Sequence, residues 1–413
     1  MKRTSLLLTL IFALLTEVSG QYDVAWQIIP SGVSENLYSV HFANSNAGYI
    51  GGAGARCLKS TNEGKNWASV SVPSVADFQT VWATSPGDAY LGGWDTVYAT
   101  HNGGQSWYDG YTNSFLLAVN DLQFLSPDNG YAFMQFSSFV KTANAGSTWS
   151  EPSGSGIIED YLAGFMLNQS TGFVVGQCGH IARTDDGGAT WVFYEWNNYA
   201  DWSCIDIYGL HFTSATNGYA VADSGVVFRT TDGGNYWSRT EIAGPEDRLT
   251  DVFFLNANIG WISGYNGLIF KTTDGGDNWV QEPQMTFVNL HGIFFISESL
   301  GWAVGDEGVI LRYGVGGPSG LGDIQADSPG ELLAYPNPAG EYIEIELILR
   351  DGDDYSLQLL DQYGRTIKEI QQSTLRSGKY TLQITLAGLP DGTYLCRLTN
   401  GKGAGIDRMF VKQ

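Results

Sequence analysis

The chain has 413 residues, enough for more than one domain, and its 53 Gly, 22 Tyr, 20 Phe and 13 Trp are typical of turn-rich β-structure around a well-filled core. Its formal net charge is -22 at pH 7. Nucleic acids and anionic lipid surfaces are bound by clustered Lys and Arg, so this charge argues against both as partners.

The first 20 residues have the three parts of a secretory signal peptide. Lys2 and Arg3 are basic, residues 6–15 are apolar, and small residues at positions 18–20 precede Gln21. The apolar run is roughly half as long as a bilayer-spanning helix, and no later run is longer. We therefore predict a cleaved signal peptide over residues 1–20 and no transmembrane segment.

A nine-residue pattern recurs six times and divides most of the chain into similar units. Its last copy is Lys271–Trp279, with the sequence KTTDGGDNW, and the steps from one terminal Trp to the next are 40, 42, 42, 46 and 42 residues. A period near 40 residues fits one four-stranded propeller blade. The terminal residues of the six copies are Trp67, Trp107, Trp149, Trp191, Trp237 and Trp279.

Each unit also contains strand-like segments before this pattern. In the sixth unit they are Leu249–Leu255, Gly260–Gly264 and Gly267–Lys271, which we expect to be strands A, B and C. The nine-residue pattern then forms the turn from C to D, and strand D begins at Trp279. The repeating unit is therefore a whole blade.

A seventh unit, residues 290–313, has strands A, B and C but lacks the pattern and strand D. At the other end of the mature chain, residues 25–28 resemble residues 278–281, where strand D of the sixth unit begins. We therefore predict an all-β fold, with a seven-bladed β-propeller over residues 21–313 that is closed by its N-terminal strand. Closure removes exposed strand edges that would otherwise template aggregation.

The C-terminal part of the chain has a different composition. Residues 314–330 are rich in Gly and polar residues and are expected to be a flexible linker. Residues 331–413 contain alternating runs at 342–347, 355–360 and 380–384, separated by Asp/Gly turns. Short alternating strands at this spacing predict a small Ig-like β-sandwich.

The nine-residue pattern favours a structural role. Its Asp or Asn can accept hydrogen bonds from backbone N–H groups of its own turn, its Gly permits a positive φ, and its Trp can pack between blades. The first three copies hold Asn and so carry no charge at this position, which argues for folding and against the alternative, a metal or catalytic role. The six residues are Asn62, Asn102, Asn144, Asp186, Asp232 and Asp274.

The pattern Ser/Thr-x-Asp-x-Gly-x-Thr-Trp resembles the Asp-box or BNR repeat of sialidases, sortilin-type receptors and some β-glucanases. The long repeat, with its Gly-Tyr strand B and Gly-x-Ile strand C, is most similar to the propellers of photosystem II assembly and stability factors. The resemblance covers residues 22–313 and implies the propeller fold. For the assembly factors it also implies a basic partner-binding patch, and this acidic chain shows none.

Sialidases imply a further test, because they hold the substrate carboxylate with three arginines. Arg183, Arg229 and Arg312 share one repeat position with Lys in other units, immediately before the box. A position that accepts either cation indicates a structural role, for example pairing with a neighbouring carboxylate. Sialidase activity is therefore not expected.

The turns from B to C and the connections from D to A are expected on the face opposite to the boxes, where a ligand would bind. Their aromatic rings can stack on sugars, while Asp, Asn and Gln bond to hydroxyls, so we predict that this face binds an extracellular glycan or protein. The alternative is ordinary loops that pack their own aromatics. The candidate residues are Trp94, Asp95, Phe136, Trp196, Tyr199, Asp201, Trp202, Asp223, Tyr265 and Asp306.

Two other functions stay open. A glycoside hydrolase would need two carboxylates ~5 to 10 Å apart, and its candidates are Asp95, Asp206, Asp223 and Asp306. The assembly-factor resemblance implies the second, a role in building a protein complex. His41, His180, His211 and His291 lack the spacing of metal ligands, and neither a metal site nor a cofactor is predicted.

The four cysteines divide into two kinds. Cys57 falls in the middle of a strand and is expected to be buried. Cys178 falls at a B-to-C turn and Cys204 in the connection after the same blade, so a disulfide between them is possible in an oxidising compartment, and two free thiols are the alternative. Cys396 lies in a C-terminal strand, where we expect it to be buried and unpaired.

The C-terminal landmarks resemble the sorting domain of type IX secretion cargo. They are Leu333–Pro338, Leu360–Arg365, Leu389–Leu398 and the basic end Arg408–Lys412, in that order. The resemblance covers residues 331–413 and implies passage from the periplasm across the outer membrane by the type IX machinery. The protein is then expected to be secreted or attached to the cell surface.

Overall fold

The computed structural model describes residues 24–112, 117–135, 139–152, 161–194, 205–315, 330–335, 339–349, 352–361, 365–390, 392–401 and 405–412. The predicted signal peptide and most of the predicted linker lie outside these ranges. No helix among the described residues is long and apolar enough to cross a membrane.

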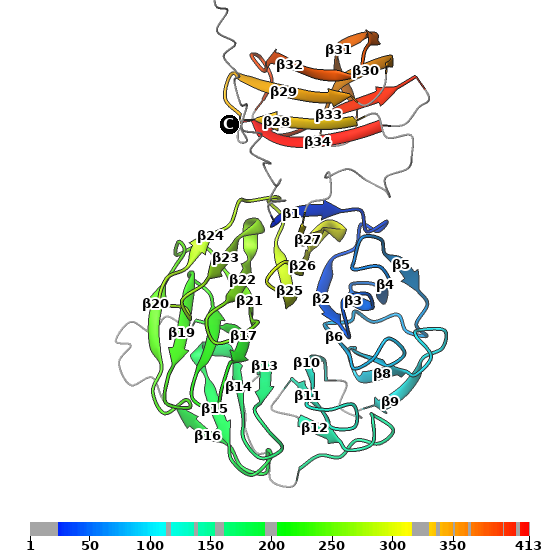
Figure 1. Cartoon of the computed structure of the whole chain (residues 1–413). Coiled ribbons are helices and arrows are strands. Elements are labelled where there is room, and N and C mark those ends of the chain that lie inside the picture. Colours follow the sequence, from blue (N-terminus) through cyan, green and yellow to red (C-terminus); the bar gives the residue numbers. More distant parts are fainter. Residues whose placement is uncertain are drawn as a thin grey trace, which may run out of the picture.

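In the described residues, the N-terminal region forms seven antiparallel sheets around a common centre, and strand A of each repeat lies nearest that centre (Figure 1). Blade 1 contains β2 (Leu37–Phe42), β3 (Gly48–Gly52), β4 (Arg56–Ser60) and β5 (Ala68–Val70). Blade 2 contains β6 (Thr80–Ala83), β7 (Ala89–Gly92), β8 (Thr96–Thr100) and β9 (Tyr108–Thr112). Blade 3 contains β10 (Val119–Phe124), β11 (Gly130–Met134) and β12 (Phe139–Thr142).

Blades 4 to 6 again have four consecutive strands each. Blade 4 contains β13 (Tyr161–Met166), β14 (Gly172–Gly176), β15 (Ile181–Thr184) and β16 (Val192–Tyr194). Blade 5 contains β17 (Ile207–Phe212), β18 (Gly218–Ala222), β19 (Val226–Thr230) and β20 (Ser238–Glu241). Blade 6 contains β21 (Leu249–Phe254), β22 (Gly260–Gly264), β23 (Ile269–Thr272) and β24 (Val280–Gln281).

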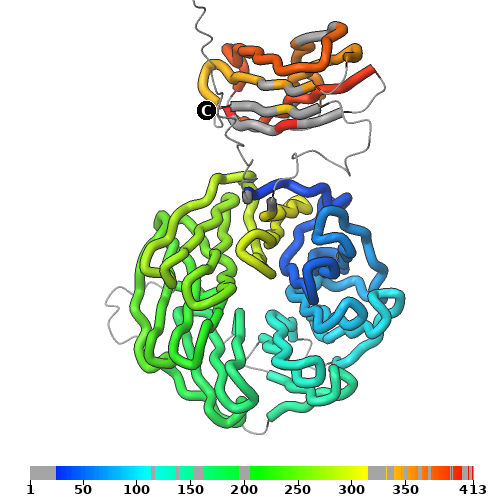
Figure 2. Tube along the Cα trace, viewed as in Figure 1, coloured from blue at the N-terminus to red at the C-terminus, as the bar shows by residue number. Residues whose placement is uncertain are grey.

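Blade 7 joins the two ends of the propeller. Its strands β25 (Leu290–Ser297), β26 (Leu300–Gly305) and β27 (Ile310–Val315) come last in the ring, and β1 (Val24–Ile29) supplies the fourth. β1 pairs antiparallel with β27, with Trp26 opposite Tyr313. Figure 2 shows the chain passing once around the ring, from blue to yellow, before it returns to its own N-terminal strand. The predicted seven-bladed propeller closed by its N-terminal strand is confirmed.

Blade 3 is the least regular blade. Its described part has three named strands, and where strand D is expected an isolated bridge pairs Lys141 with Ser150. The neighbouring residues 153–160 lie outside the described part. The predicted four strands are therefore observed in six blades. In the described part of blade 3, a single bridge is found in place of strand D.

Aromatic stacking between blades explains the repeated Gly-aromatic pair of strand B. Trp302 of blade 7 stacks on Phe42 of blade 1 with centroids 3.4 Å apart, and Trp261 of blade 6 stacks on Phe295 of blade 7 at 3.5 Å. The preceding glycine leaves room for the phenylalanine of its own strand A, because a Cβ on Gly301 would lie 2.3 Å from the Phe295 ring. The glycine of strand B thus makes room for one aromatic ring, and the aromatic residue that follows it packs against the next blade, which allows the blades to pack closely.

A second set of contacts links the inner strands around the centre. His41 of blade 1 stacks on Trp82 of blade 2 at 4.1 Å and contacts Phe294 of blade 7 at 4.5 Å. Phe253 of blade 6 continues this ring of side chains, 5.0 Å from Phe294 and 5.2 Å from His211 of blade 5. Burial lowers the pKa of His41 to about 3 and that of His211 to about 4, so both are neutral packing residues near pH 7.

The C-terminal strands form two sheets with a shared apolar core, in agreement with the predicted small sandwich. One sheet contains β28 (Gly330–Tyr335), β29 (Tyr342–Leu349) and β32 (Gly378–Thr385). The other contains β31 (Thr366–Leu375), β30 (Asp353–Asp361), β33 (Gly392–Asn400) and β34 (Gly405–Lys412). Cys396 is a free, buried cysteine in this core, and Cys57 is free and buried in blade 1.

Candidate binding face

The propeller has two faces with different turns. Antiparallel strands place the A-to-B turns and the boxes on one face, which we call the box side. They place the B-to-C turns and the entries into strand A on the other, which we call the B–C face. Backbone hydrogen bonds tie the B–C face together, such as Tyr265 N–H to Arg248 O at 2.8 Å within blade 6 and Gly225 N–H to Asp247 O at 2.7 Å between blades 5 and 6.

The boxes use their polar atoms inside their own turns. In blade 4, Thr184 Oγ1 donates to Asp186 Oδ1 at 2.9 Å, and the same oxygen accepts the Thr190 N–H at 2.8 Å. The hydrogen bonds from Thr190 lower the pKa of Asp186 to about 2. In blade 3, Asn144 Oδ1 accepts from Thr142 Oγ1 and from Thr148 N–H, both at 2.9 Å. An uncharged amide thus makes the same bonds, which supports a structural role for the box.

The Lys or Arg near the end of strand C, present in six of the seven blades, contacts the next blade. Lys59 Nζ donates to Gly103 O at 2.8 Å and Arg183 Nη1 donates to Gly233 O at 2.7 Å, in both cases to the box of the following blade. Arg312 of blade 7 closes the circle, since its Nε donates to the Glu63 carbonyl of blade 1 at 2.8 Å and its Nη2 contacts the Glu63 carboxylate at 3.2 Å. These cations are bound on the box side and therefore do not form an anion site on the B–C face.

The predicted ligand-binding residues are only partly described. Phe136, Trp196, Tyr199, Asp201 and Trp202 lie outside the described residues. Trp94 and Asp95 form the tip of the B-to-C turn between β7 and β8, where Trp94 is 53% exposed and Asp95 accepts a hydrogen bond from Thr96 Oγ1 at 2.8 Å. The remaining three, Asp223, Tyr265 and Asp306, lie at the B-to-C turns of blades 5, 6 and 7.

Asp223 and Tyr265 are brought together by Arg248, which lies in the connection between blades 5 and 6. Arg248 Nε donates to Asp223 Oδ1 at 2.7 Å, and its Nη1 donates to the Tyr265 hydroxyl at 3.2 Å. The guanidinium also lies 4.4 Å from the ring centre of Tyr208 and 4.9 Å from that of Tyr265, within the range of cation–π attraction. All four side chains are partly exposed.

Asp306 belongs to a second polar group on blade 7. Its Oδ1 lies 2.7 Å from His291 Nε2, and its Oδ2 accepts a hydrogen bond from Asn289 Nδ2 at 2.9 Å. His291 also meets Tyr265 of blade 6 and Tyr38 of blade 1 edge to face, with ring centroids 6.0 and 5.4 Å apart. The two groups are therefore continuous across blades 5, 6, 7 and 1.

Two of the four candidate catalytic carboxylates converge. The Tyr208 hydroxyl lies 3.1 Å from Asp223 Oδ2 and 3.3 Å from Asp206 Oδ2. Each carboxylate has other bonds as well, since Asp206 Oδ1 accepts from Cys178 N–H at 3.0 Å and Asp223 is paired with Arg248. Burial, followed by the charge of Asp223, raises the pKa of Tyr208, so its hydroxyl keeps its proton and can donate to only one carboxylate at a time.

An open groove of about 690 Å³ lies where the closing strand leads into blade 1. It is lined by residues 28–35, 307–309, Arg56 and Ser69, and its lining contains no aromatic residue. Arg56 forms an ion pair with Glu35 there. The groove therefore offers less for recognition than the aromatic group beside it.

Cys178 is disulfide-bonded, and it lies on the B–C face at the turn after β14. Cys204 lies outside the described residues, so the pairing of Cys178 with Cys204 stays a prediction. Tyr38, Tyr208 and Arg248 also belong to this face but were not predicted from the sequence. Arg248 is a single cation in the connection between two repeats, and nothing in the alternation of strand A distinguishes the two tyrosines.

Comparisons with known proteins agree with this architecture. Residues 194–284 and 248–314 match the family model of the photosynthesis system II assembly factor YCF48, and residues 333–412 match that of the secretion system C-terminal sorting domain. None of the curated proteins compared matches the sequence significantly.

Solved structures with the same fold include "YCF48 bound to D1 peptide", at 18% identity over 70% of this chain and 96% of the other, with a TM-score of 0.60. YCF48 from Cyanidioschyzon merolae follows at 17% identity over 70% and 98%, with a TM-score of 0.58. PorZ of Porphyromonas gingivalis, described as an essential bacterial surface component of the type IX secretion system, is 12% identical over 93% of this chain and 60% of its own, with a TM-score of 0.52. Identities this low show the fold alone.

The sorting-domain match implies export by the type IX secretion system, and hence a secreted or cell-surface protein. The chain is therefore a seven-bladed β-propeller similar to the photosystem II assembly factors, followed by a C-terminal sorting domain of the type IX secretion system.

Proposed function

We propose that this protein binds an extracellular glycan or protein through the B–C face of its propeller, after export directed by residues 331–413. It acts as a binding module at or beyond the cell surface. The glycan and the protein are both compatible with a face that combines aromatic rings with hydrogen-bonding groups.

One observation carries this proposal. On the B–C face, the aromatic and charged side chains around Arg248 and His291 form a continuous, partly exposed group that draws on four blades. On the box side, by contrast, the polar atoms that recur in the boxes are used within the turns. Binding sites of this kind are commonly built on loops that a rigid scaffold holds in place.

Proteins of similar fold support a binding role for the propeller. A propeller of this fold is known in a structure titled "YCF48 bound to D1 peptide", so the scaffold is compatible with a peptide ligand. PorZ, which has a similar fold, is described as a bacterial surface component of the type IX secretion system.

A glycoside hydrolase is the second candidate, because Asp206 and Asp223 converge on the Tyr208 hydroxyl. A general acid needs a proton near neutral pH and a nucleophile or base needs access to the sugar. Asp223 already forms an ion pair with Arg248, 2.7 Å from its Nε, and this engagement by the protein's own side chain favours binding over catalysis. Hydrolysis of any β-glucan by the purified protein, lost in Asp223→Asn, would establish the enzyme instead.

The proposal is tested with the full chain on arrays of glycans and peptides. The variant Arg248→Met removes the cation that contacts Asp223, Tyr208 and Tyr265 on the B–C face, and Lys65→Met is the matched control, since it removes an exposed cation of the same charge on the box side. We expect the wild type and Lys65→Met to bind the same ligands with the same affinity, and Arg248→Met to bind them with an altered affinity, because this variant changes the charge beside Asp223 and the packing of Tyr208 and Tyr265. Equal binding by all three would place the ligand elsewhere, and binding to nothing on either array would contradict the proposed function.

A further inference from the structure

Strand A carries a β-bulge at the same place in six blades. The pairing register between strands A and B skips one residue near the start of β2, β10, β13, β17, β21 and β25. Bulges insert one extra residue and turn its side chain away from the regular alternation, and they are frequent beside binding sites. The skipped residues are Tyr38, Asn120, Leu162, Tyr208, Thr250 and His291.

These bulge positions have different chemistry around the ring. Asn120 and Thr250 are used inside the scaffold, because their side chains donate to the carbonyl oxygens of Tyr161 and Leu290 in the next blade. Tyr38, Tyr208 and His291 instead bring large rings to the rim on the B–C face. On blades 5, 7 and 1, the β-bulge of strand A therefore carries a side chain that is available for recognition.

Two further side chains join these three into one arc. Arg248 lies against both Tyr208 and Tyr265, and His291 lies edge to face with both Tyr265 and Tyr38. We call this group the rim arc. Its five members, in order along the ring, are Tyr208, Arg248, Tyr265, His291 and Tyr38.

Carboxylates outnumber cations along the rim arc. Asp206 and Asp223 contact the Tyr208 hydroxyl, and Asp306 contacts His291. At the far end, burial and then the negative charges of Asp77 and Asp306 raise the pKa of Tyr38. Arg248 is the one guanidinium among the five arc residues, and the whole chain has a net charge of -22. The field at the arc therefore favours a cation.

We infer that the rim arc binds an extended basic segment of a partner protein and takes its Lys or Arg side chains against the tyrosine rings. This inference rests on the proposed function and names the ligand class for the same face. The faces of tyrosine rings attract ammonium and guanidinium groups, and the nearby carboxylates add a long-range attraction. Tyr and Arg are also the residues that dominate binding energy in protein interfaces. A neutral glycan could hydrogen-bond to these carboxylates but would gain no long-range attraction from their surplus charge.

The test uses the full chain and a fluorescein-labelled peptide of eight residues in which Gly alternates with Lys and Arg. Its counterpart carries Glu at the basic positions, and cellohexaose is the glycan probe. Binding is measured by fluorescence anisotropy near physiological ionic strength, with cellohexaose as competitor and in a separate calorimetric titration. Every protein is first checked for an unchanged melting temperature.

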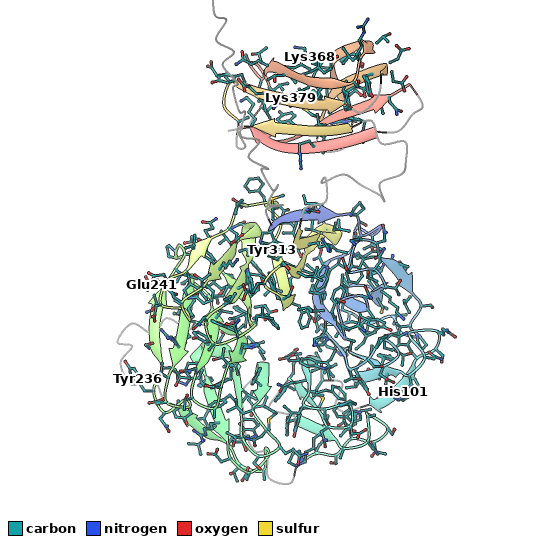
Figure 3. The ribbon with its side chains drawn as sticks, viewed as in Figure 1. His101, Tyr236, Glu241, Tyr313, Lys368 and Lys379 are labelled. Atoms are coloured by element: carbon teal, nitrogen blue, oxygen red, sulfur yellow. The ribbon has the colours of Figure 1, made fainter. Side chains whose placement is uncertain are left out.

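Four variants keep the net charge of the protein and so isolate the rings. Tyr208→Ala combined with Tyr265→Ala is expected to weaken binding of the basic peptide by about tenfold or more, as two cation–π contacts are lost. Tyr208→Phe keeps the ring and is expected to change the affinity less than about twofold. Tyr236→Ala, an exposed tyrosine at the outer edge of blade 5 (Figure 3), is the matched control and should bind like the wild type. Tyr38→Ala, at the other end of the arc, is expected to cost about threefold to tenfold and replaces the double variant if that does not fold.

The outcomes separate this inference from the proposed function. Binding of the basic peptide but not of the Glu peptide, lost in the ring variants and kept in Tyr236→Ala, supports the inference. Equal affinity of wild type and ring variants overturns it, because attraction to the acidic surface as a whole would then suffice. Binding of cellohexaose that the ring variants lose, without peptide binding, overturns the inference but leaves the proposed function standing. Binding of neither probe also overturns it, while the arrays decide the proposed function independently.

Discussion

Replacing Trp26 by Ala should weaken the closure of the propeller in blade 7. Trp26 lies in β1, the only strand that the N-terminal end contributes to blade 7, and it is 4% exposed. Its ring lies 5.6 Å from Phe295 and 5.1 Å from Tyr313, in the core between blades 6 and 7. If the N-terminal strand closes the ring, this side chain is the main apolar anchor of the closure.

The size of the effect follows from burial. Removing a buried Trp side chain typically costs about 3–5 kcal/mol of unfolding free energy, from lost transfer energy and the cavity that remains. The Trp26 indole N–H has no acceptor among the described atoms, so no hydrogen bond is lost in addition. Since a typical domain is stable by only about 5–15 kcal/mol, the expected loss is a large fraction of the total.

The assay is guanidinium unfolding followed by circular dichroism, with the unfolding free energy obtained by linear extrapolation. Trp94→Ala is the matched control, because Trp94 is 53% exposed at a turn and its loss should change the unfolding free energy by no more than about 0.5 kcal/mol. We expect the unfolding free energy of Trp26→Phe to lie between those of Trp26→Ala and Trp94→Ala. If Trp26→Ala were as stable as Trp94→Ala, the N-terminal strand would contribute little and the closure described above would be wrong.

Three further predictions concern pH, ring closure and export. Burial raises the pKa of Asp121 and of Asp251 to about 7, above the ordinary value of 3.8, so the native state holds these protons more tightly than the unfolded state does. The stability that the two protonated carboxyls contribute should therefore be fully present below about pH 4 and lost as the pH rises through 7. The loss should be at most about 1.4 kcal/mol per pH unit for each carboxyl. Asp121→Asn combined with Asp251→Asn should flatten this slope in denaturation series between pH 4 and 8, and an unchanged slope would refute the assignment. Arg312→Met should lower the unfolding free energy by about 1–3 kcal/mol, because the Glu63 carbonyl and carboxylate lose a charged hydrogen-bond donor. In the same denaturant assay, a loss below about 0.5 kcal/mol would contradict the role of Arg312 in ring closure. Deletion of residues 331–413 should leave the protein in the periplasm in cell fractionation, and normal export without them would contradict the sorting role.

The fold could be predicted from the sequence because each blade repeats the same local rules. The Trp spacing gave the period, and the likeness of residues 25–28 to 278–281 located the closing strand, since both pair with a strand C in the same way. The order of strands within a blade also followed from the repeat. What the sequence did not show is the irregular blade 3, where the bridge Lys141–Ser150 replaces a full outer strand.

The candidate site was less predictable, for a physical reason. A β-bulge is a shift of register between two strands, and a sequence that alternates over six residues does not reveal that one residue is skipped. Tyr38 and Tyr208 therefore read as ordinary strand residues. Arg248 could not be assigned to the face either, because its two tyrosine neighbours come from different blades. Only the turn residues Asp223, Tyr265 and Asp306 were accessible from the pattern, because turn tips are identified by the repeat itself.

Hydrogen–deuterium exchange with the basic peptide tests the central claim most directly, which is that the B–C face and not the box side is the binding face. Backbone amides exchange more slowly where a ligand reduces local opening. With the peptide at saturation, we predict added protection at residues 36–40, 205–210, 246–250, 263–268 and 289–293. Protection confined to the boxes, such as residues 232–236 and 274–278, or no change anywhere in the propeller, would contradict the account.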